Sequence, residues 1–308
     1  MANITASMVK DLRDRTGAGM MDCKNALGEA GGDMEAAIDW LRAKGLAKAA
    51  KKSGRVASEG LVGVAVDAGA GALVEVNSET DFVARNDEFK GFVKRAAELA
   101  LKTGGDAEKL VASAAEDGGA TIADTLTQLI AKIGENMSVR RAAALTVSPG
   151  VVATYVHNAA SPELGRIGVL VALQSEADPE KLKAFGKQLA MHVAAAAPIA
   201  LTAAHVPAEV AERERAIFAD QAKESGKPDN IVQKMVEGRM KKFYQESVLL
   251  DQTFVIDGET PVGKVVEHAA KELGHPVEIV GFLRYAVGEG IEKEDSDFAD
   301  EVKSMAGT

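Results

Sequence analysis

The sequence predicts an α+β fold that is divided into several units along 308 residues. The first 45 residues place apolar side chains at helical spacing, whereas from residue 60 onward apolar and polar residues alternate as they do in β-strands. A pair of such strands followed by a helix occurs twice, at residues 61–99 and 151–191. The repeat indicates a core of two similar α+β subdomains, and the chain length allows two or more domains.

Residues 1–46 are expected to form a small domain of three helices. Thr5 can cap the first helix, the second is expected over residues 20–30, and Asp33 can cap the third. The predicted buried side of the third helix consists of Met34, Ala37, Ile38 and Leu41. Fewer than 50 residues give only a thin core, so this domain is a small module.

Two features of this module have more than one interpretation. Met20 and Met21 are either core residues or an adaptable contact surface, whereas Cys23 is expected to be a buried thiol. Residues 47–59 are predicted to be a polar linker. The basic stretch 44–55, which overlaps this linker, is either solvated or a nucleic-acid contact.

The first core subdomain is expected at residues 60–148. Apolar alternation predicts strands at 61–66 and 72–76, joined by a glycine-containing turn. A helix is expected to begin near Asp87. Its predicted apolar face is formed by Phe89, Phe92, Val93, Ala96 and Leu99.

The second core subdomain is expected at residues 149–195 and 246–286. Its strands are predicted at 151–156 and 167–173, with a longer turn between them, and a helix follows from Pro179. Further strands are expected at residues 254–256 and 278–287.

The intervening segment, residues 196–245, is predicted to contain a helical hairpin, because glycine and Pro228 separate two charge-rich helical stretches. Val210 and Ile217 are expected on one face of the first helix. The expected face of the second helix is Val232, Val236, Met240 and Phe243. The hairpin is either an arm for self-association or an element that packs against its own domain.

Residues 80–83 follow directly on a predicted strand and place an acid beside a large apolar ring. Phe82 is either a core ring under the following helix, with Asp81 as a turn or cap residue, or an exposed wedge for a partner. His157, near the predicted turn of the second strand pair, is either an ordinary surface histidine or a contact residue.

Composition argues against several other classes of protein. One cysteine and five scattered histidines predict neither an internal disulfide nor a metal site, and a net charge of −10 argues against broad nucleic-acid binding. No apolar run reaches the roughly 18 residues that span a bilayer, and no secretory signal precedes the first helix, so we expect a cytoplasmic protein. Phosphate-binding glycine loops and nucleophile–base spacings are not found, so we expect no cofactor and no covalent chemistry.

Five blocks of sequence together resemble one family, that of bacterial elongation factor Ts. They are residues 16–24 (TGAGMMDCK), 80–83 (TDFV), 132–136 (KIGEN), 235–243 (MVEGRMKKF) and 287–293 (VGEGIEK). The resemblance covers nearly the whole chain in order. It implies a three-helix domain like the ubiquitin-associated domain, two similar core subdomains, a helical hairpin used in dimerisation and a C-terminal helical module at 287–308. The turn 158–165 departs from the family in looking longer.

The resemblance implies that the protein promotes exchange of GDP for GTP on elongation factor Tu, a GTPase, without binding nucleotide, nucleic acid or membrane itself. Residues 80–83 (Thr80, Asp81, Phe82 and Val83) would enter beside the nucleotide and its magnesium ion. The other residues expected to contact the partner are Arg13, Met20, Met21 and Lys24 in the first module, Ile133, Gly134, His157, Val255 and Ile256 in the core, and Phe298 in the C-terminal helix.

Two other functions are compatible with the residues alone. An adaptor or scaffold whose first module recruits a different protein would bind that protein without affecting nucleotide release. An α/β enzyme would turn over a small molecule, and the sequence shows no convergent set of polar residues for such a reaction.

Overall fold

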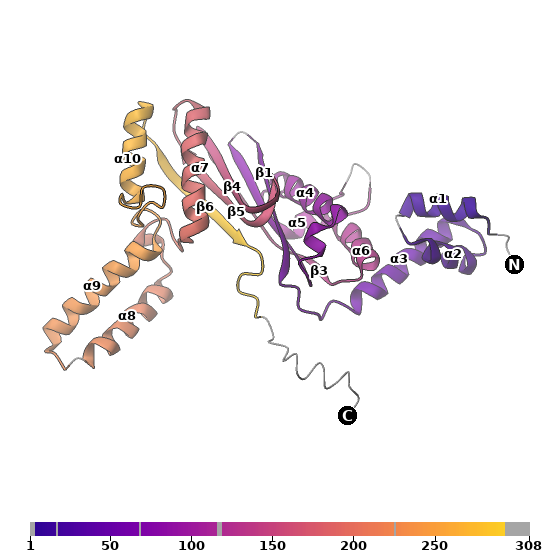
Figure 1. Ribbon diagram of the computed structural model, residues 1–308, viewed down its shortest axis with the longest axis horizontal. Helices are drawn as coiled ribbons and strands as arrows, with labels where there is room; N and C mark the ends of the chain where they lie inside the picture. Colours follow the sequence, from indigo (N-terminus) through magenta and orange to yellow (C-terminus); the bar gives the residue numbers. More distant parts are fainter. Residues whose placement is uncertain (1–3, 17, 68, 116–118, 225, 293–308) are drawn as a thin grey trace.

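The computed structural model describes residues 4–16, 18–67, 69–115, 119–224 and 226–292. The molecule is elongated (Figure 1): three helices lie at one end, β-sheet and its covering helices lie in the middle, and a helical hairpin projects at the other end. No helix in the described ranges is long and apolar enough to cross a membrane. The predicted C-terminal helix with Phe298 lies outside the described residues.

The N-terminal module consists of α1 (Ala6–Thr16), α2 (Met20–Glu29) and α3 (Met34–Ala50). Both predicted caps are present: the Met8 N–H donates to Thr5 Oγ1 at 3.3 Å, and the Ala36 N–H donates to Asp33 Oδ1 at 2.8 Å. Leu12, Cys23 and Leu27 are among the fully buried residues of its small core. Helix α3 extends into the segment predicted as a linker, because alanine and lysine there favour helix.

The basic stretch 44–55 is largely occupied by contacts within the chain. Lys44 and Lys48 on α3 donate to the carboxylate of Asp22 on α2, at 3.0 and 3.2 Å. The hydrogen bond from Lys44 is the main cause that lowers the pKa of Asp22 below its ordinary value. Arg55 Nη1 lies 3.4 Å from Oε2 of Glu79, the residue that follows strand β2 (Ala70–Ser78). These lysines and this arginine therefore fasten α3 and the linker to other parts of the protein.

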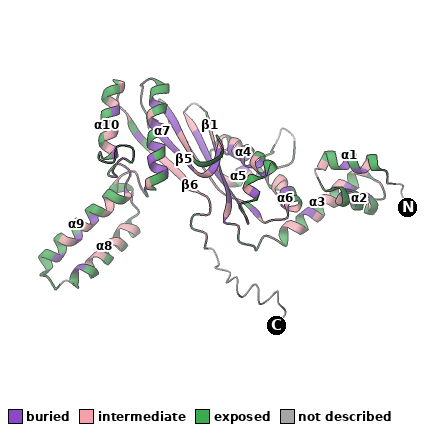
Figure 2. Ribbon diagram, viewed as in Figure 1, coloured by how far each residue is buried: buried purple, intermediate pink, exposed green. Residues whose placement is uncertain are grey.

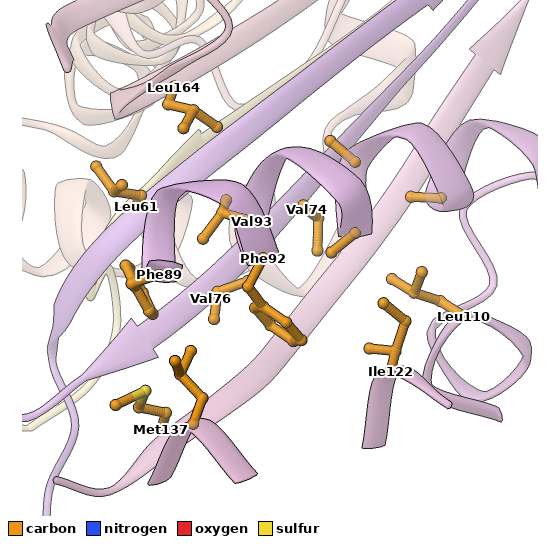
Figure 3. Packing of buried hydrophobic residues seen from close by; sticks show 14 of the residues in the cluster. Leu61, Val74, Val76, Phe89, Phe92, Val93, Leu110, Ile122, Met137 and Leu164 are labelled. Atoms are coloured by element: carbon orange, nitrogen blue, oxygen red, sulfur yellow. The ribbon is translucent and has the colours of Figure 1, made fainter. Parts of the chain in front are cut away.

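The first subdomain contains β1 (Glu59–Asp67), β2 (Ala70–Ser78) and β3 (Met137–Thr146), which are antiparallel. Helices α4 (Asp87–Lys102), α5 (Ala107–Ala112) and α6 (Ile122–Ile133) cover one side of these strands. Figure 3 shows Phe89, Phe92 and Val93 of α4 packed over Val74 and Val76 of β2. The predicted apolar face of the first helix of this subdomain is thus the face that forms the core.

The second subdomain contains β4 (Gly150–Ser161), β5 (Leu164–Gln174) and β6 (Glu278–Ala286), with α7 (Pro179–Ala196) and α10 (Val262–Leu273) on their outer side. The expected long turn at 158–165 is wrong. A register shift between Ala159 and Ser161 lets the strands continue almost to the end of the hairpin. His157 consequently lies within β4, opposite Ile167.

The expected strand at residues 254–256 is also wrong. The Phe254 N–H donates to Thr260 O and the Gly258 N–H donates to Phe254 O, both at 2.8 Å, so this segment folds back on itself. Gly258 has a φ of +72°, which a turn of this kind requires. Phe254 is buried in the core, whereas Val255 and Ile256 are exposed at the tip.

The two subdomains share a six-stranded sheet with the order β3-β2-β1-β5-β4, in which β6 also pairs with β5. The junction is short, with Val62 opposite Gly165 and Gly63 opposite Leu164. Away from it, the two halves pack against each other through Val62, Val64, Leu73, Val152, Leu170 and Ala172. The helices therefore lie on the outer sides of the two halves (Figure 2), and purple buried residues concentrate between them.

The helical hairpin consists of α8 (Ala208–Lys223) and α9 (Asp229–Ser247), and it projects from the second subdomain. The predicted seam of α9 is confirmed for Val232, Val236 and Met240, which are buried. Ile217 on α8 was expected on the packed face and is instead 42% exposed. Phe218 and Ala222 occupy the seam, because their spacing, and not that of Ile217, follows the stripe facing α9.

The arrangement of the hairpin favours a projecting arm over packing against its own domain. Its buried side chains pack on one another. At its base, Val210 packs against Ala200, Val206 and Val248, which lie in the segments that connect the hairpin to the second subdomain. The two helices lie away from the sheet in Figure 1.

A buried carboxylate connects the first subdomain to the chain after β6. Glu75 on β2 has no exposed surface. Its Oε1 accepts from the Gly288 N–H at 2.8 Å, from Asn77 Nδ2 at 3.0 Å and from Arg140 Nη1 at 3.1 Å, and its Oε2 accepts from Arg141 Nε at 2.5 Å. The hydrogen bond from Gly288 fixes the place where the chain leaves the sheet after β6.

The donors around Glu75 determine its charge. Burial, the largest single influence, raises the pKa of Glu75, but the hydrogen bonds from Gly288, Asn77 and Arg141 together outweigh it and hold the pKa below the ordinary value of 4.5. The ionised form is therefore stabilised by folding. This contribution is present above the pKa of the unfolded chain and is lost as the pH falls through the lower pKa of the folded protein.

We predict that Glu75→Gln lowers the free energy of unfolding by about 2–4 kcal/mol at neutral pH, because it removes the buried charge that Arg140 and Arg141 share. The difference from the parent should shrink as the pH falls below 4.5. Equilibrium unfolding in denaturant at several pH values measures both effects. Glu98→Gln is the matched control: its partner Arg95 is on the surface, and we expect a loss of less than about 0.5 kcal/mol. Equal losses in the two variants would contradict the prediction.

Candidate functional site

The loop after β2 presents an aromatic ring to solvent. Phe82 is 70% exposed, whereas its neighbour Val83 is only 3% exposed and belongs to the core of the first subdomain. The interpretation of Phe82 as a core ring is therefore wrong. A short 3-10 turn, Val83–Arg85, begins here, and the Arg85 N–H donates to Phe82 O at 3.1 Å. Because this turn directs Val83 inward, the adjacent ring points outward.

An arginine covers part of the exposed ring. The Arg85 guanidinium lies 5.7 Å from the centroid of Phe82, and its Nη2 donates to Asp81 Oδ2 at 3.2 Å. Asp81 is thus a turn residue, and the cap of the following helix is Asn86, whose side chain accepts from the Glu88 and Phe89 N–H groups. The loop combines an apolar ring, an acid and a base within five residues, all of them partly or wholly accessible.

A second loop, between α6 and β3, lies against the first. Helix α6 ends at Gly134, whose φ of +91° is the left-handed conformation typical of a helix end. In the next residue, Glu135 Oε2 accepts from the Thr80 N–H at 2.9 Å and Oε1 accepts from the Thr80 hydroxyl at 2.7 Å. Glu79 Oε1 in turn accepts from the Asn136 N–H at 2.5 Å. The structure therefore brings Thr80–Val83 together with Ile133 and Gly134.

The linker from the N-terminal module reaches the same place. Asn136 Nδ2 donates to Arg55 O at 2.7 Å, and the Arg55 side chain lies 3.4 Å from Glu79. Three segments that are distant in sequence, near residues 55, 80 and 135, consequently meet beside the exposed ring.

The N-terminal module offers a second exposed apolar surface. Met20 and Met21 on α2 are 51% and 66% exposed, so their interpretation as core residues is wrong. Lys24 lies four and three residues further along the same helix and is exposed, as is Arg13 on α1. Cys23 is buried as expected, and burial raises the pKa of its thiol.

The remaining predicted residues lie on the second subdomain. His157 is exposed on β4, with its Nδ1 3.1 Å from the Tyr155 hydroxyl. Val255 and Ile256 are exposed at the tip of their turn, which is held from beneath because the Val255 N–H donates to Nδ1 of the buried His192 at 3.2 Å. The exposed residues are thus carried by separate elements of the protein.

A cavity of about 860 Å³ lies between the N-terminal module and the first subdomain. Charged residues on its walls are paired with each other, as in Arg42 with Asp124 at 2.9 Å and Lys44 with Asp22 at 3.0 Å. Within the described ranges, no group of three or more His, Cys, Asp or Glu side chains is arranged to hold a metal ion.

Sequence reasoning missed the two carboxylates that hold the loops together. Glu79 directly precedes the 80–83 block, and Glu135 lies inside the 132–136 block, so both were next to residues already singled out. The spacing of 55 residues between Thr80 and Glu135 gives no indication that the two loops touch. The register of the sheet explains the contact, because Ser78 at the end of β2 pairs with Met137 at the start of β3.

The sequence is similar to those of known proteins over its whole length. Residues 79–289 match the family model described as Elongation factor TS. The chain is 62% identical over 307 residues to "Elongation factor Ts" of Rhodospirillum centenum, with both proteins fully covered. It is 62% identical over 306 residues to that of Rhodospirillum rubrum, with 99% of each covered, and 59% identical over 308 residues to that of Paramagnetospirillum magneticum, covering 100% of this chain and 99% of the relative. This chain therefore belongs to the elongation factor Ts family.

Proposed function

We propose that the protein binds elongation factor Tu in its GDP form and promotes release of GDP, so that GTP can take its place. The single observation that carries this proposal is Phe82, an aromatic ring that is 70% exposed on a loop fixed by hydrogen bonds on both sides. A large exposed ring beside an acid suits insertion into a pocket of another protein. Membership of the elongation factor Ts family supports elongation factor Tu as this partner.

The energy needed for such insertion is within reach of one ring. Burying a phenylalanine side chain contributes about 2–3 kcal/mol, and about 1.4 kcal/mol corresponds to a tenfold change in affinity. A GTPase holds the phosphates of GDP with backbone N–H groups and a magnesium ion, and small displacements of these groups weaken the binding strongly. The carboxylate of Asp81, which is half exposed, would bring negative charge toward the phosphates.

Other exposed surfaces would orient the ring on the partner. We infer that Met20, Met21, Lys24 and Arg13 contact the GTPase domain, and that His157, Val255 and Ile256 contact another domain of the same partner. Contacts at several separated points raise the effective concentration of the ring at its target. The resemblance also assigns the C-terminal helix, with Phe298, to the GTPase domain.

Thermodynamic linkage then explains how the cycle ends. If the protein lowers the affinity of the partner for nucleotide by some factor, nucleotide lowers the affinity of the partner for the protein by the same factor. Entry of GTP therefore releases the protein. No covalent bond changes in this exchange, so the activity requires no acid, base or nucleophile.

We predict that Phe82→Ala slows GDP release by at least tenfold while leaving the free energy of unfolding within about 0.5 kcal/mol of the parent, because the ring is mostly exposed. Stopped-flow release of a fluorescent GDP analogue from elongation factor Tu measures the rate, and denaturant unfolding measures the stability. Val66→Ala, which also shortens an exposed apolar side chain, serves as the control and should leave the rate unchanged.

The outcomes separate nucleotide exchange from the adaptor or scaffold function. An unchanged rate in folded Phe82→Ala would contradict the insertion of this ring. Tight binding of the parent to elongation factor Tu with no acceleration of GDP release would instead support an adaptor or scaffold.

We also propose that the projecting hairpin mediates self-association, since Ile217 and Ile231 leave apolar surface exposed along it. Replacing residues 207–242 by a short flexible linker should change the oligomeric state of the protein more than it affects the rate of GDP release. Analytical ultracentrifugation over a range of protein concentrations tests this. The same oligomeric state for the deletion variant and the parent would count against the hairpin as the site of association.

A further inference from the structure

We propose that Glu135 is a positioning residue for Phe82, and that its bridge to Thr80 holds the exposed ring in place before any partner binds. The role in exchange rests on the proposed function above, whereas the bridge itself is a property of the free protein. Glu135 lies 55 residues from Thr80 in sequence and belongs to a different loop. It therefore acts on the ring only through the folded structure.

The carboxylate of Glu135 satisfies both donors of Thr80. Its Oε2 accepts from the backbone N–H at 2.9 Å, and its Oε1 accepts from the hydroxyl at 2.7 Å. Two hydrogen bonds from one residue to the two oxygens of an ionised carboxylate restrict both its distance and its orientation. Thr80 precedes Phe82 by two residues, so its backbone direction determines where the ring begins.

The bridge is reciprocal, which makes it stiffer than a single contact. While Glu135 accepts from the loop that carries Phe82, Glu79 of that loop accepts from the Asn136 N–H on the other. Each loop thus supplies a carboxylate to a backbone donor of its neighbour, and these donors would otherwise lack a partner in the loop. Arg55 closes the arrangement through its contacts with Glu79 and Asn136.

The exposed ring has few other supports. On its C-terminal side, Val83 is anchored in the core and Arg85 packs against the ring. On its N-terminal side, the hydrogen bonds of Thr80 to other described residues are those with Glu135 and the one from the Ser78 hydroxyl to Thr80 O at 3.0 Å. Removal of the Glu135 carboxylate would take away both of these hydrogen bonds to Thr80 and loosen this side of the loop, and the ordering of the loop would then oppose binding.

Hydrogen exchange in the free protein tests the bridge without any partner. In Glu135→Ala the Thr80 amide should exchange at least about tenfold faster, because it loses its acceptor, while amides in the centre of β2 keep their protection. In Glu135→Gln the protection should be largely kept, since the side-chain amide oxygen accepts from the Thr80 N–H and its NH2 group donates to the Thr80 hydroxyl. Glu267→Ala is the matched control: it removes a carboxylate on α10 whose two oxygens accept hydrogen bonds from Lys264, and it should leave the exchange of the Thr80 amide unchanged.

A double-mutant cycle on GDP release from elongation factor Tu tests the positioning role. Alone, Glu135→Ala should slow release by about tenfold, whereas Glu135→Gln should remain near the parent rate. In a Phe82→Ala background, Glu135→Ala should slow release by less than about twofold, because a residue that acts through the ring has little effect when the ring is missing.

Equal losses in the two backgrounds would overturn the proposal, since Glu135 would then act independently of the ring. Unchanged exchange of the Thr80 amide in Glu135→Ala would overturn the bridge. If the parent does not accelerate GDP release, the proposed function fails and the positioning role fails with it, while faster exchange of the Thr80 amide would still establish the bridge.

Discussion

The close packing of the two halves of the sheet determines where every other element can lie. A Cβ atom at Gly168 would come within 2.6 Å of Val62 Cγ1, and one at Gly71 within 2.7 Å of Val152 Cγ1, so these positions require glycine. Because the inner faces are occupied by each other, the helices are confined to the outer faces. The loops that join helices to strands then emerge at the edges of the sheet. The exposed candidate residues of the two subdomains are found on such loops and near strand ends.

Regular periodicity made much of this fold predictable, and the exceptions have physical causes. The helices of the N-terminal module and the first strand pair follow their apolar patterns closely. Strand β3 was not predicted, because Arg140 and Arg141 interrupt any alternation, and their function is to neutralise the buried Glu75. The hydrogen bonds that stabilise this carboxylate join distant residues, 213 positions apart for Gly288 and 65 and 66 for Arg140 and Arg141, and a local pattern does not reveal them.

The candidate site was only partly predictable for a related reason. Phe82 and Val83 are adjacent and both apolar, so composition does not decide which of them is buried. The 3-10 turn decides it by directing Val83 into the core. Likewise, the contact between the two loops follows from the pairing of Ser78 with Met137, and this register is fixed by the whole sheet and not by the loops themselves.

A protein that displaces groups in a partner must be stiffer at the point of contact than the groups it displaces, because otherwise its own loop would move instead. Under the proposed function, the three segments that join beside Phe82 would supply this stiffness. Arg55 carries the linker from the N-terminal module into the same set of hydrogen bonds that fixes Thr80, while Arg42 on α3 pairs with Asp124 on α6. The module that offers Met20 and Met21 and the loop that offers Phe82 are therefore attached to one frame. Under the proposed function, binding energy gained at the first surface would then be available to press the ring into its target.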